Sequence, residues 1–105
     1  MDLKEYEILD VREDSLMYFH YLVVVLKDKE TNMRESREIS AKSPLYELLR
    51  IGVPGDILYA SGPEFTKGKM YVLCTKDGCF THQKGQMRRW ENFGEVKEQE
   101  RGERK

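Results

Sequence analysis

Hydrophobic and polar positions along the chain alternate in short runs that favour β-strands. Residues 6–11 alternate with one interruption, because Ile8 and Leu9 stand together, and this predicts a first strand with a β-bulge. Residues 17–26 are aromatic and β-branched on both faces, which predicts a central strand covered on both sides for much of its length. The polar residues 14–15 are expected to turn the chain between these two strands. Four further strands are expected: residues 34–40, 56–60, 70–75 and 79–83. The first of them is mostly hydrophilic, which suits either a sheet edge or a half-exposed partner strand.

One short helix is expected between the third and fourth strands, at about residues 44–51. Ser43 can accept a hydrogen bond from a free amide of the first turn, and Pro44 loses only an N–H that has no helical partner. Gly52 is expected in the left-handed conformation just past the helix, with Val53 folded back on the last turn. The apolar residues recur at the spacing of one helix face: Leu45, Leu48 and Leu49.

The dipeptide Asp77-Gly78 is the strongest hairpin signal in the chain, because both residues tolerate a positive φ. Placing them at the turn predicts a register of directly opposed residues: Lys76 with Cys79, Cys74 with Thr81, Leu73 with His82 and Tyr71 with Lys84. Alternation leaves open which face of this hairpin is exposed, the one with Tyr71, Leu73 and Phe80 or the one with Met70, Val72 and Cys74. Residues 85–93 are expected to add a short strand or a turn of helix.

Two cysteines and a histidine lie within nine residues, which raises the question of a metal. In the predicted register Cys74 and Cys79 are diagonal neighbours about 7–8 Å apart, a separation too long for a disulfide. His82 points to the opposite face. We therefore expect two reduced, half-buried thiols, no metal ligands and no cofactor. Zinc held by these three residues, with His20 or a carboxylate as the fourth ligand, stays open as the alternative.

Length and composition fit one small globular domain, which we expect at residues 1–93 and to be followed by a charged, flexible tail at 94–105. The longest apolar run, residues 16–26, is about half the length that a bilayer crossing requires, so no membrane segment is expected. The polar start of the chain and the reduced cysteines favour a cytoplasmic location.

Charge is distributed unevenly along the chain. Residues 1–14 carry six acids and two bases, whereas residues 67–90 carry six bases and one acid. Bases interleaved with aromatic rings are typical of a nucleic-acid-binding surface, in which rings stack on bases and cations follow the phosphates. The hypothesis is therefore a non-enzymatic module that binds single- or double-stranded nucleic acid through Lys67, Lys69, Tyr71, Lys84, Arg88, Arg89 and Trp90.

The alternative hypothesis is a protein-binding accessory or inhibitor subunit. It would act through an edge strand or through residues 85–93, and an edge strand could also pair two copies of the chain into a homodimer. No phosphate-binding loop or nucleophile motif occurs, so no enzymatic activity is expected. A small nuclease that uses His82 and Arg88 stays open.

The order of three strands, a helix and further strands resembles the oligonucleotide/oligosaccharide-binding (OB) fold. The segments Tyr46-x-x-Leu49, Gly55-Asp56 and Ile57-Leu58-Tyr59 are also similar to those of a bacterial family of small barrels of unknown function. The resemblance covers roughly residues 5–84. It implies a mainly β fold, namely a five- to six-stranded antiparallel barrel of the OB or SH3 type with one helix between the third and fourth strands.

Overall fold

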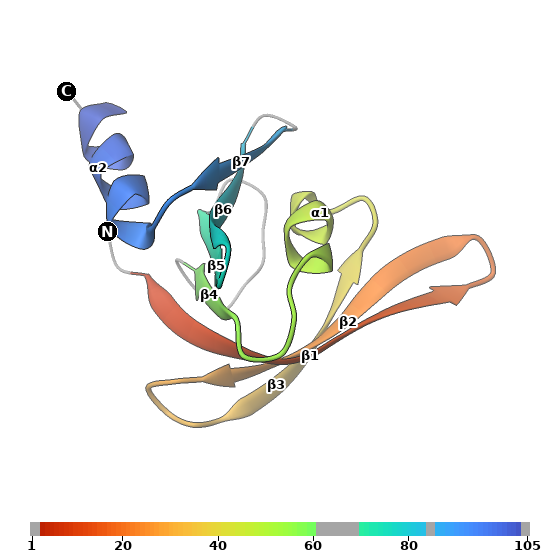
Figure 1. Ribbon diagram of the computed structural model, residues 1–105. Helices are drawn as coiled ribbons and strands as arrows, with labels where there is room; N and C mark the ends of the chain where they lie inside the picture. Colours follow the sequence, from red (N-terminus) through yellow and green to blue (C-terminus); the bar gives the residue numbers. More distant parts are fainter. Residues whose placement is uncertain (1–2, 61–69, 84–85, 104–105) are drawn as a thin grey trace.

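A single antiparallel sheet of seven strands forms the body of the protein (Figure 1). The computed structural model describes residues 3–60, 70–83 and 86–103. The strands follow one another across the sheet in the order β3-β2-β1-β4-β5-β6-β7. Their bounds are β1 Lys4–Leu16, β2 Phe19–Asp28, β3 Arg34–Ser40, β4 Ile57–Ala60, β5 Tyr71–Thr75, β6 Gly78–Gln83 and β7 Gln86–Trp90; the helices are α1 Pro44–Arg50 and α2 Phe93–Glu103.

The seven strands form one open sheet, so the expected barrel of five or six strands is not confirmed. β1 pairs with β2 on one side and with β4 on the other, and β5, β6 and β7 extend the sheet beyond β4. Among the described strands, β3 and β7 therefore form the two edges, and no pairing joins them. The mainly β class and the helix between the third and fourth strands are confirmed.

The first hairpin is longer than its sequence suggests. The predicted bulge is confirmed, because the β1–β2 register shifts between Ile8 and Asp10. The predicted turn at residues 14–15 is wrong, since the strands continue to the pair Leu16↔Phe19 and turn at residues 17–18. Packing explains the difference. The register is set by burial of the inner face of β2, and in that register Asp14 and Ser15 pair with Tyr21 and His20 although both favour turns.

β2 is covered on one face only. Its inward side chains, Leu22, Val24 and Leu26, are fully buried. Its outward side chains, Tyr21, Val23 and Val25, are half-buried, so the expected cover on both sides is wrong.

Helix α1 lies against the inner face of the sheet and supplies the centre of the main core (Figure 1). Ser43 caps it by accepting a hydrogen bond from the amide of Leu45 at 3.2 Å, as predicted. The three leucines of its predicted apolar face are buried. The expectation at its end is wrong: Gly52 is not in the left-handed region, and Val53 is 55% exposed. Gly52 serves close packing instead, because an added Cβ would lie 3.0 Å from Ile8 Cδ1.

Strands β4, β5 and β6 are covered on both faces, which answers the question that the sequence left open, whereas four of the five residues of β7 are exposed. Leu58, Tyr71 and Leu73 face the main core, where Phe80 packs against them. Val72, Cys79, Trp90 and Val96 form a second core on the opposite face. Neither face of the β5–β6 hairpin is therefore presented to solvent.

Helix α2 covers the second core, where the sequence had suggested a flexible tail. Asn92 Oδ1 accepts a hydrogen bond from the amide of Glu95 at 2.9 Å, and the Glu95 carboxylate accepts one from the amide of Glu91 at 3.3 Å. Val96 is 2% exposed, and the Phe93 ring stacks on Tyr59 with 4.0 Å between centroids. Residues 93–103 thus form a capped helix held by a few apolar contacts. Neither α1 nor α2 has the length and apolar character needed to cross a membrane.

Candidate functional site

The residues predicted to bind nucleic acid do not gather into an exposed surface of rings and cations. Lys67, Lys69 and Lys84 lie outside the described residues. Tyr71 and Trp90 are 9% and 6% exposed, so neither ring offers a face on which a base could stack. The exposed members of the set are Arg88 and Arg89, which lie next to each other on the edge strand β7.

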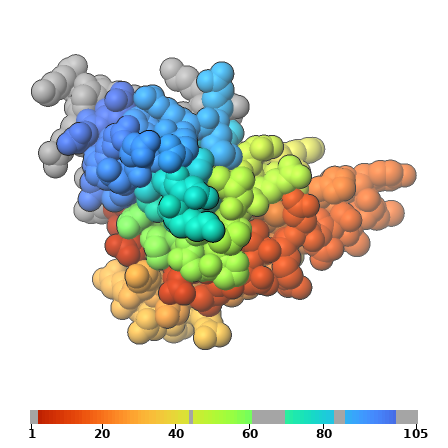
Figure 2. Space-filling model, in the orientation of Figure 1, coloured from red at the N-terminus to blue at the C-terminus, as the bar shows by residue number. Residues whose placement is uncertain are grey.

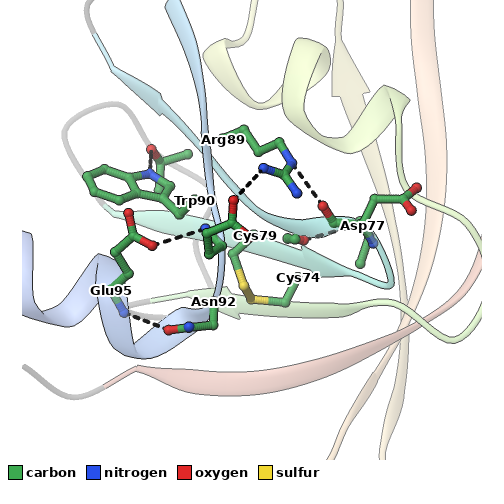
Figure 3. The surroundings of a disulfide bond; sticks show 11 residues. Cys74, Asp77, Cys79, Arg89, Trp90, Asn92 and Glu95 are labelled. Carbon is green, nitrogen blue, oxygen red and sulfur yellow. Dashed lines mark hydrogen bonds and ion pairs between the residues drawn. A yellow bond between two sulfur atoms is a disulfide. The ribbon is translucent and has the colours of Figure 1, made fainter.

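Arg89 and Trp90 hold β7 to the neighbouring hairpin (Figure 3), and Arg88 packs on the Trp90 ring within β7. The indole Nε1–H of Trp90 donates to Thr81 Oγ1 at 2.9 Å, and the Arg88 guanidinium lies 4.0 Å from the centroid of the Trp90 ring. Arg89 Nε donates to the carbonyl oxygen of Asp77 at 2.9 Å, and its Nη1 pairs with the Glu91 carboxylate at 3.1 Å. These contacts give β7 a structural role.

Cys74 and Cys79 form a disulfide between directly opposed residues of β5 and β6, so the expected pair of reduced thiols is wrong (Figure 3). Their Cα atoms are 4.1 Å apart. The predicted register was wrong by two residues, because the turn lies at residues 76–77 and Thr75 is opposite Gly78. Thr75 Oγ1 accepts from the amide of Asp77 at 3.0 Å and donates to the carbonyl of Gly78 at 3.2 Å, which stabilises this turn.

The disulfide also removes the argument for a reducing compartment, since that argument rested on free thiols. Over the ranges 3–60, 70–83 and 86–103, no three His, Cys, Asp or Glu residues are grouped so that they could hold a metal ion. His20 is exposed near the end of the first hairpin, whereas His82 is half-buried on β6.

The most exposed apolar surface lies at the end of the β1–β2 hairpin, which sequence reasoning assigned to a buried strand. Residues 12–20 are all exposed, and with Tyr21 we call them the arm. Figure 2 shows the arm, in orange, projecting from the body of the molecule. Four consecutive apolar side chains form its tip, with exposed fractions of 67% for Leu16, 85% for Met17, 92% for Tyr18 and 67% for Phe19.

The turn at the tip keeps an apolar residue where the backbone favours another type. Met17 has a φ of +55°, in the left-handed region that glycine and asparagine adopt most readily. For a residue with a Cβ, this conformation costs about 1–2 kcal/mol. A strained backbone and exposed apolar side chains at one turn are typical of a contact surface.

Carboxylates accompany the tip. Residues 10–21 contain three acids and one arginine. Arg12 pairs with Asp10 at 3.2 Å, and Glu13 pairs with Arg50 of α1 at 2.8 Å. Asp14 instead accepts hydrogen bonds from the amide of Ser15 at 2.8 Å and from the Tyr21 hydroxyl at 3.4 Å.

The acidic surroundings act on the arm's second tyrosine, Tyr21. Burial and then the Asp14 carboxylate hold the pKa of Tyr21 above its ordinary value, and Glu38 on β3 adds to the effect. The arm therefore presents an apolar tip with negative charge behind it.

No turn-forming residue in the sequence marks the tip of the arm. The pair Leu16-Met17 continues directly into Tyr18-Phe19 without any of the turn-forming residues that usually bound a strand. Propensity alone places such a run in the core, and only the register shows that it lies beyond the last core position of β2, Leu22.

Comparison of the chain with protein-family models, with curated proteins and with solved structures gave no match.

Proposed function

We propose that this protein is a non-enzymatic binding module whose arm inserts its apolar tip into a pocket of a protein partner. The observation that carries the proposal is the run of four apolar side chains at a projecting turn, each 67–92% exposed. Large apolar and aromatic side chains contribute most of the binding energy of protein interfaces when they enter a partner's pocket. The fold is proposed to derive from an OB-like arrangement whose sheet stays open.

The charge near the tip indicates the chemistry of that partner. Asp14 lies on the same face as Leu16, Phe19 and Tyr21, with no cation paired to it among the described residues. A negative flank disfavours nucleic acids and anionic membrane surfaces, which carry the same sign of charge. It favours a protein pocket that is apolar inside and has lysine or arginine at its rim.

The nucleic-acid hypothesis is the second candidate, and it rests on the exposed Arg88 and Arg89. The arm is preferred because both arginines already have partners within the protein, whereas the tip side chains are exposed to solvent.

A cross-linking experiment tests the proposal directly. A photoreactive benzoylphenylalanine replaces Tyr18 in one variant and Met33 in a control variant; Met33 is also exposed, at 65%, but lies in the β2–β3 connection. In cells that express the protein, we expect position 18 and not position 33 to cross-link one partner other than a second copy of this chain. Mass spectrometry then identifies the partner peptide, which should be apolar with a lysine or arginine nearby.

Binding of the purified partner completes the test. Tyr18→Asn should weaken the affinity by about ten-fold or more, whereas Arg88→Glu should leave it unchanged. Cross-linking to lipid, or an affinity that Tyr18→Asn does not change, would overturn the proposal. Salt-sensitive binding of a labelled single-stranded oligonucleotide that Arg88→Glu abolishes would favour the nucleic-acid hypothesis instead.

A further inference from the structure

The outer side of the edge strand β3 is a second candidate contact surface, separate from the arm. β3 pairs with β2 in an unbroken register from Tyr21↔Ser40 to Lys27↔Arg34, without a bulge or a proline. On its other side no described strand pairs with it. Figure 1 shows β3 along the lower margin of the sheet, away from α2 and β7. A regular edge without a bulge or a proline is suited to pairing with a strand whose charges complement its own.

The hydrogen bonds beyond the two ends of the β2–β3 ladder show which groups of β3 point outward. The amide of Asp28 donates to the carbonyl of Met33 at 2.9 Å, and the amide of Ala41 donates to the carbonyl of His20 at 3.0 Å. Both pairs continue the register of the ladder. In an antiparallel ladder every second residue of a strand forms backbone hydrogen bonds to the same neighbour. Because residues 33 and 41 bond to β2, the backbone amides and carbonyls of the odd-numbered residues between them also bond to β2. The amides and carbonyls of Arg34, Ser36 and Glu38 therefore point away from the sheet.

These outward groups restrict how two copies of β3 can pair. In a symmetric antiparallel pair, one residue lies opposite its own copy at the two-fold axis. If that residue is Arg34, Glu35, Arg37 or Glu38, two like charges meet directly, which is destabilising. If it is Ile39 or Ser40, only the end of the strand overlaps.

Ser36 is the one residue of β3 left to lie at the two-fold axis. With Ser36 there, opposite charges on the two copies face each other. Arg34 then lies opposite Glu38 of the second copy, and Glu35 lies opposite Arg37 of the second copy. Arg34 and Glu38 are exposed, and neither forms an ion pair or hydrogen bond within the part of the chain that the structure describes. Glu35 and Arg37 are already 2.7 Å apart within one copy, so in the pair they would join a larger network.

We propose that a second copy of this chain pairs with β3 antiparallel and centred on Ser36, which extends the sheet across a two-fold axis. In this register the hydrogen-bonded pairs are 34↔38 and 36↔36. These are the residues whose amides and carbonyls point away from β2, so each can bond to the second copy. Pairing leaves the arm of each copy outside the contact.

Charge reversal and its rescue test this register. Sedimentation or light scattering should give a mass of twice 12.4 kDa for the wild-type protein at high concentration. Arg34→Glu and Glu38→Arg each place two pairs of like charges across the axis and should weaken the dimer by about ten-fold or more. The double variant Arg34→Glu/Glu38→Arg should restore it. Glu98→Arg, an equal change on an exposed position of α2, is the matched control and should have no effect.

A main-chain variant tests the hydrogen bonds separately. Ser36→Pro removes an amide that points away from β2, so it should abolish the dimer while circular dichroism shows a folded monomer. A protein that stays monomeric up to about 1 mM overturns the proposal. So does a dimer that survives Ser36→Pro, or a double variant that stays folded but does not recover the dimer.

The arm variant separates this proposal from the proposed function. Tyr18→Asn should leave the dimer intact. Loss of the dimer in Tyr18→Asn would place self-association at the arm and would overturn the β3 register. Loss of partner binding alone leaves the β3 proposal unaffected.

Discussion

The β1–β2 and β5–β6 hairpins both have two-residue turns, but they are built in opposite ways. The β5–β6 turn is polar, with Lys76 and Asp77 at its centre, and a glycine follows in a positive-φ conformation. A disulfide and the Arg89 hydrogen bond to Asp77 hold it to its neighbours. The β1–β2 turn is apolar, with methionine in the left-handed region, and it projects from the body of the molecule without a cross-link.

The difference indicates what each hairpin contributes. The β5–β6 hairpin satisfies the local preferences of its backbone and is buried on both faces, so its residues serve stability. The tip of the arm opposes those preferences and is exposed, so it adds nothing to the core. Residues that oppose local folding rules without a gain in stability are typical of binding sites.

The largest expected effect is that of Gly78→Ala in the β5–β6 hairpin. At a φ of +125° a side chain is strained, and its Cβ would lie 2.6 Å from the carbonyl oxygen of Trp90. Together these effects should lower the free energy of unfolding by about 3 kcal/mol or more. Denaturant unfolding measures it. Gly55→Ala is the control, since Gly55 has a φ of +97° with no atom near its Cβ, and it should cost only about 1–2 kcal/mol. Equal losses in the two variants would contradict a steric role for Trp90.

Loss of the disulfide should have the next largest effect. Closing a loop as short as that between Cys74 and Cys79 is expected to contribute about 2 kcal/mol. The double variant Cys74→Ser/Cys79→Ser should therefore show a Tm about 10 °C lower than the oxidised protein. A reducing agent should lower the Tm of the wild-type protein similarly and leave that of the double variant unchanged. An unchanged Tm after reduction would remove the contrast between the two hairpins.

Met17→Asn should change stability in the opposite direction. Asparagine tolerates a φ of +55° better than methionine does, so the free energy of unfolding should rise by about 1 kcal/mol. Tyr18→Asn is the control, because Tyr18 has no positive φ, and its stability should stay within about 0.5 kcal/mol of wild type. If Met17→Asn destabilises the protein, the side chain of Met17 is held by the fold, and the arm is not a free contact surface.

The smallest expected effect is on the pH dependence of stability. Burial and then the Glu5 carboxylate raise the pKa of Tyr59, whose ring lies under α2 beside the disulfide-linked hairpin. Because the folded protein holds this proton more tightly than the unfolded chain does, stability is complete below pH 10. It falls as the pH rises from there through the higher pKa of the folded protein.

Tyr59→Phe should therefore make the alkaline fall in Tm shallower. Tyr18→Phe, a change at an exposed position of the tip, should leave the slope as in the wild-type protein. Equal slopes for wild type and Tyr59→Phe would show that burial of this hydroxyl does not contribute to folding.

The amino-acid sequence by itself determined the features that depend on neighbouring residues. The cap at Ser43, the apolar face of α1 and the bulge after Ile8 follow from local spacing, and the structure confirms them. The hydrophilic character of β3 predicted an edge strand or a half-exposed one, and the structure places it at an edge. A capping pattern at Asn92 and Glu95 was also readable, although the charged segment that follows concealed it.

Only the tertiary structure decided the register of the two hairpins, and most of the candidate site follows from register. A shift of two residues brings Cys74 opposite Cys79, and an extension of three residues moves the first turn to Met17 and Tyr18. The cover of both faces of β5 likewise depends on α2, which lies far along the chain. Alternation fixes which residues share a face, but the partner strand is chosen by the packing of distant apolar side chains, and local propensity carries no record of that choice.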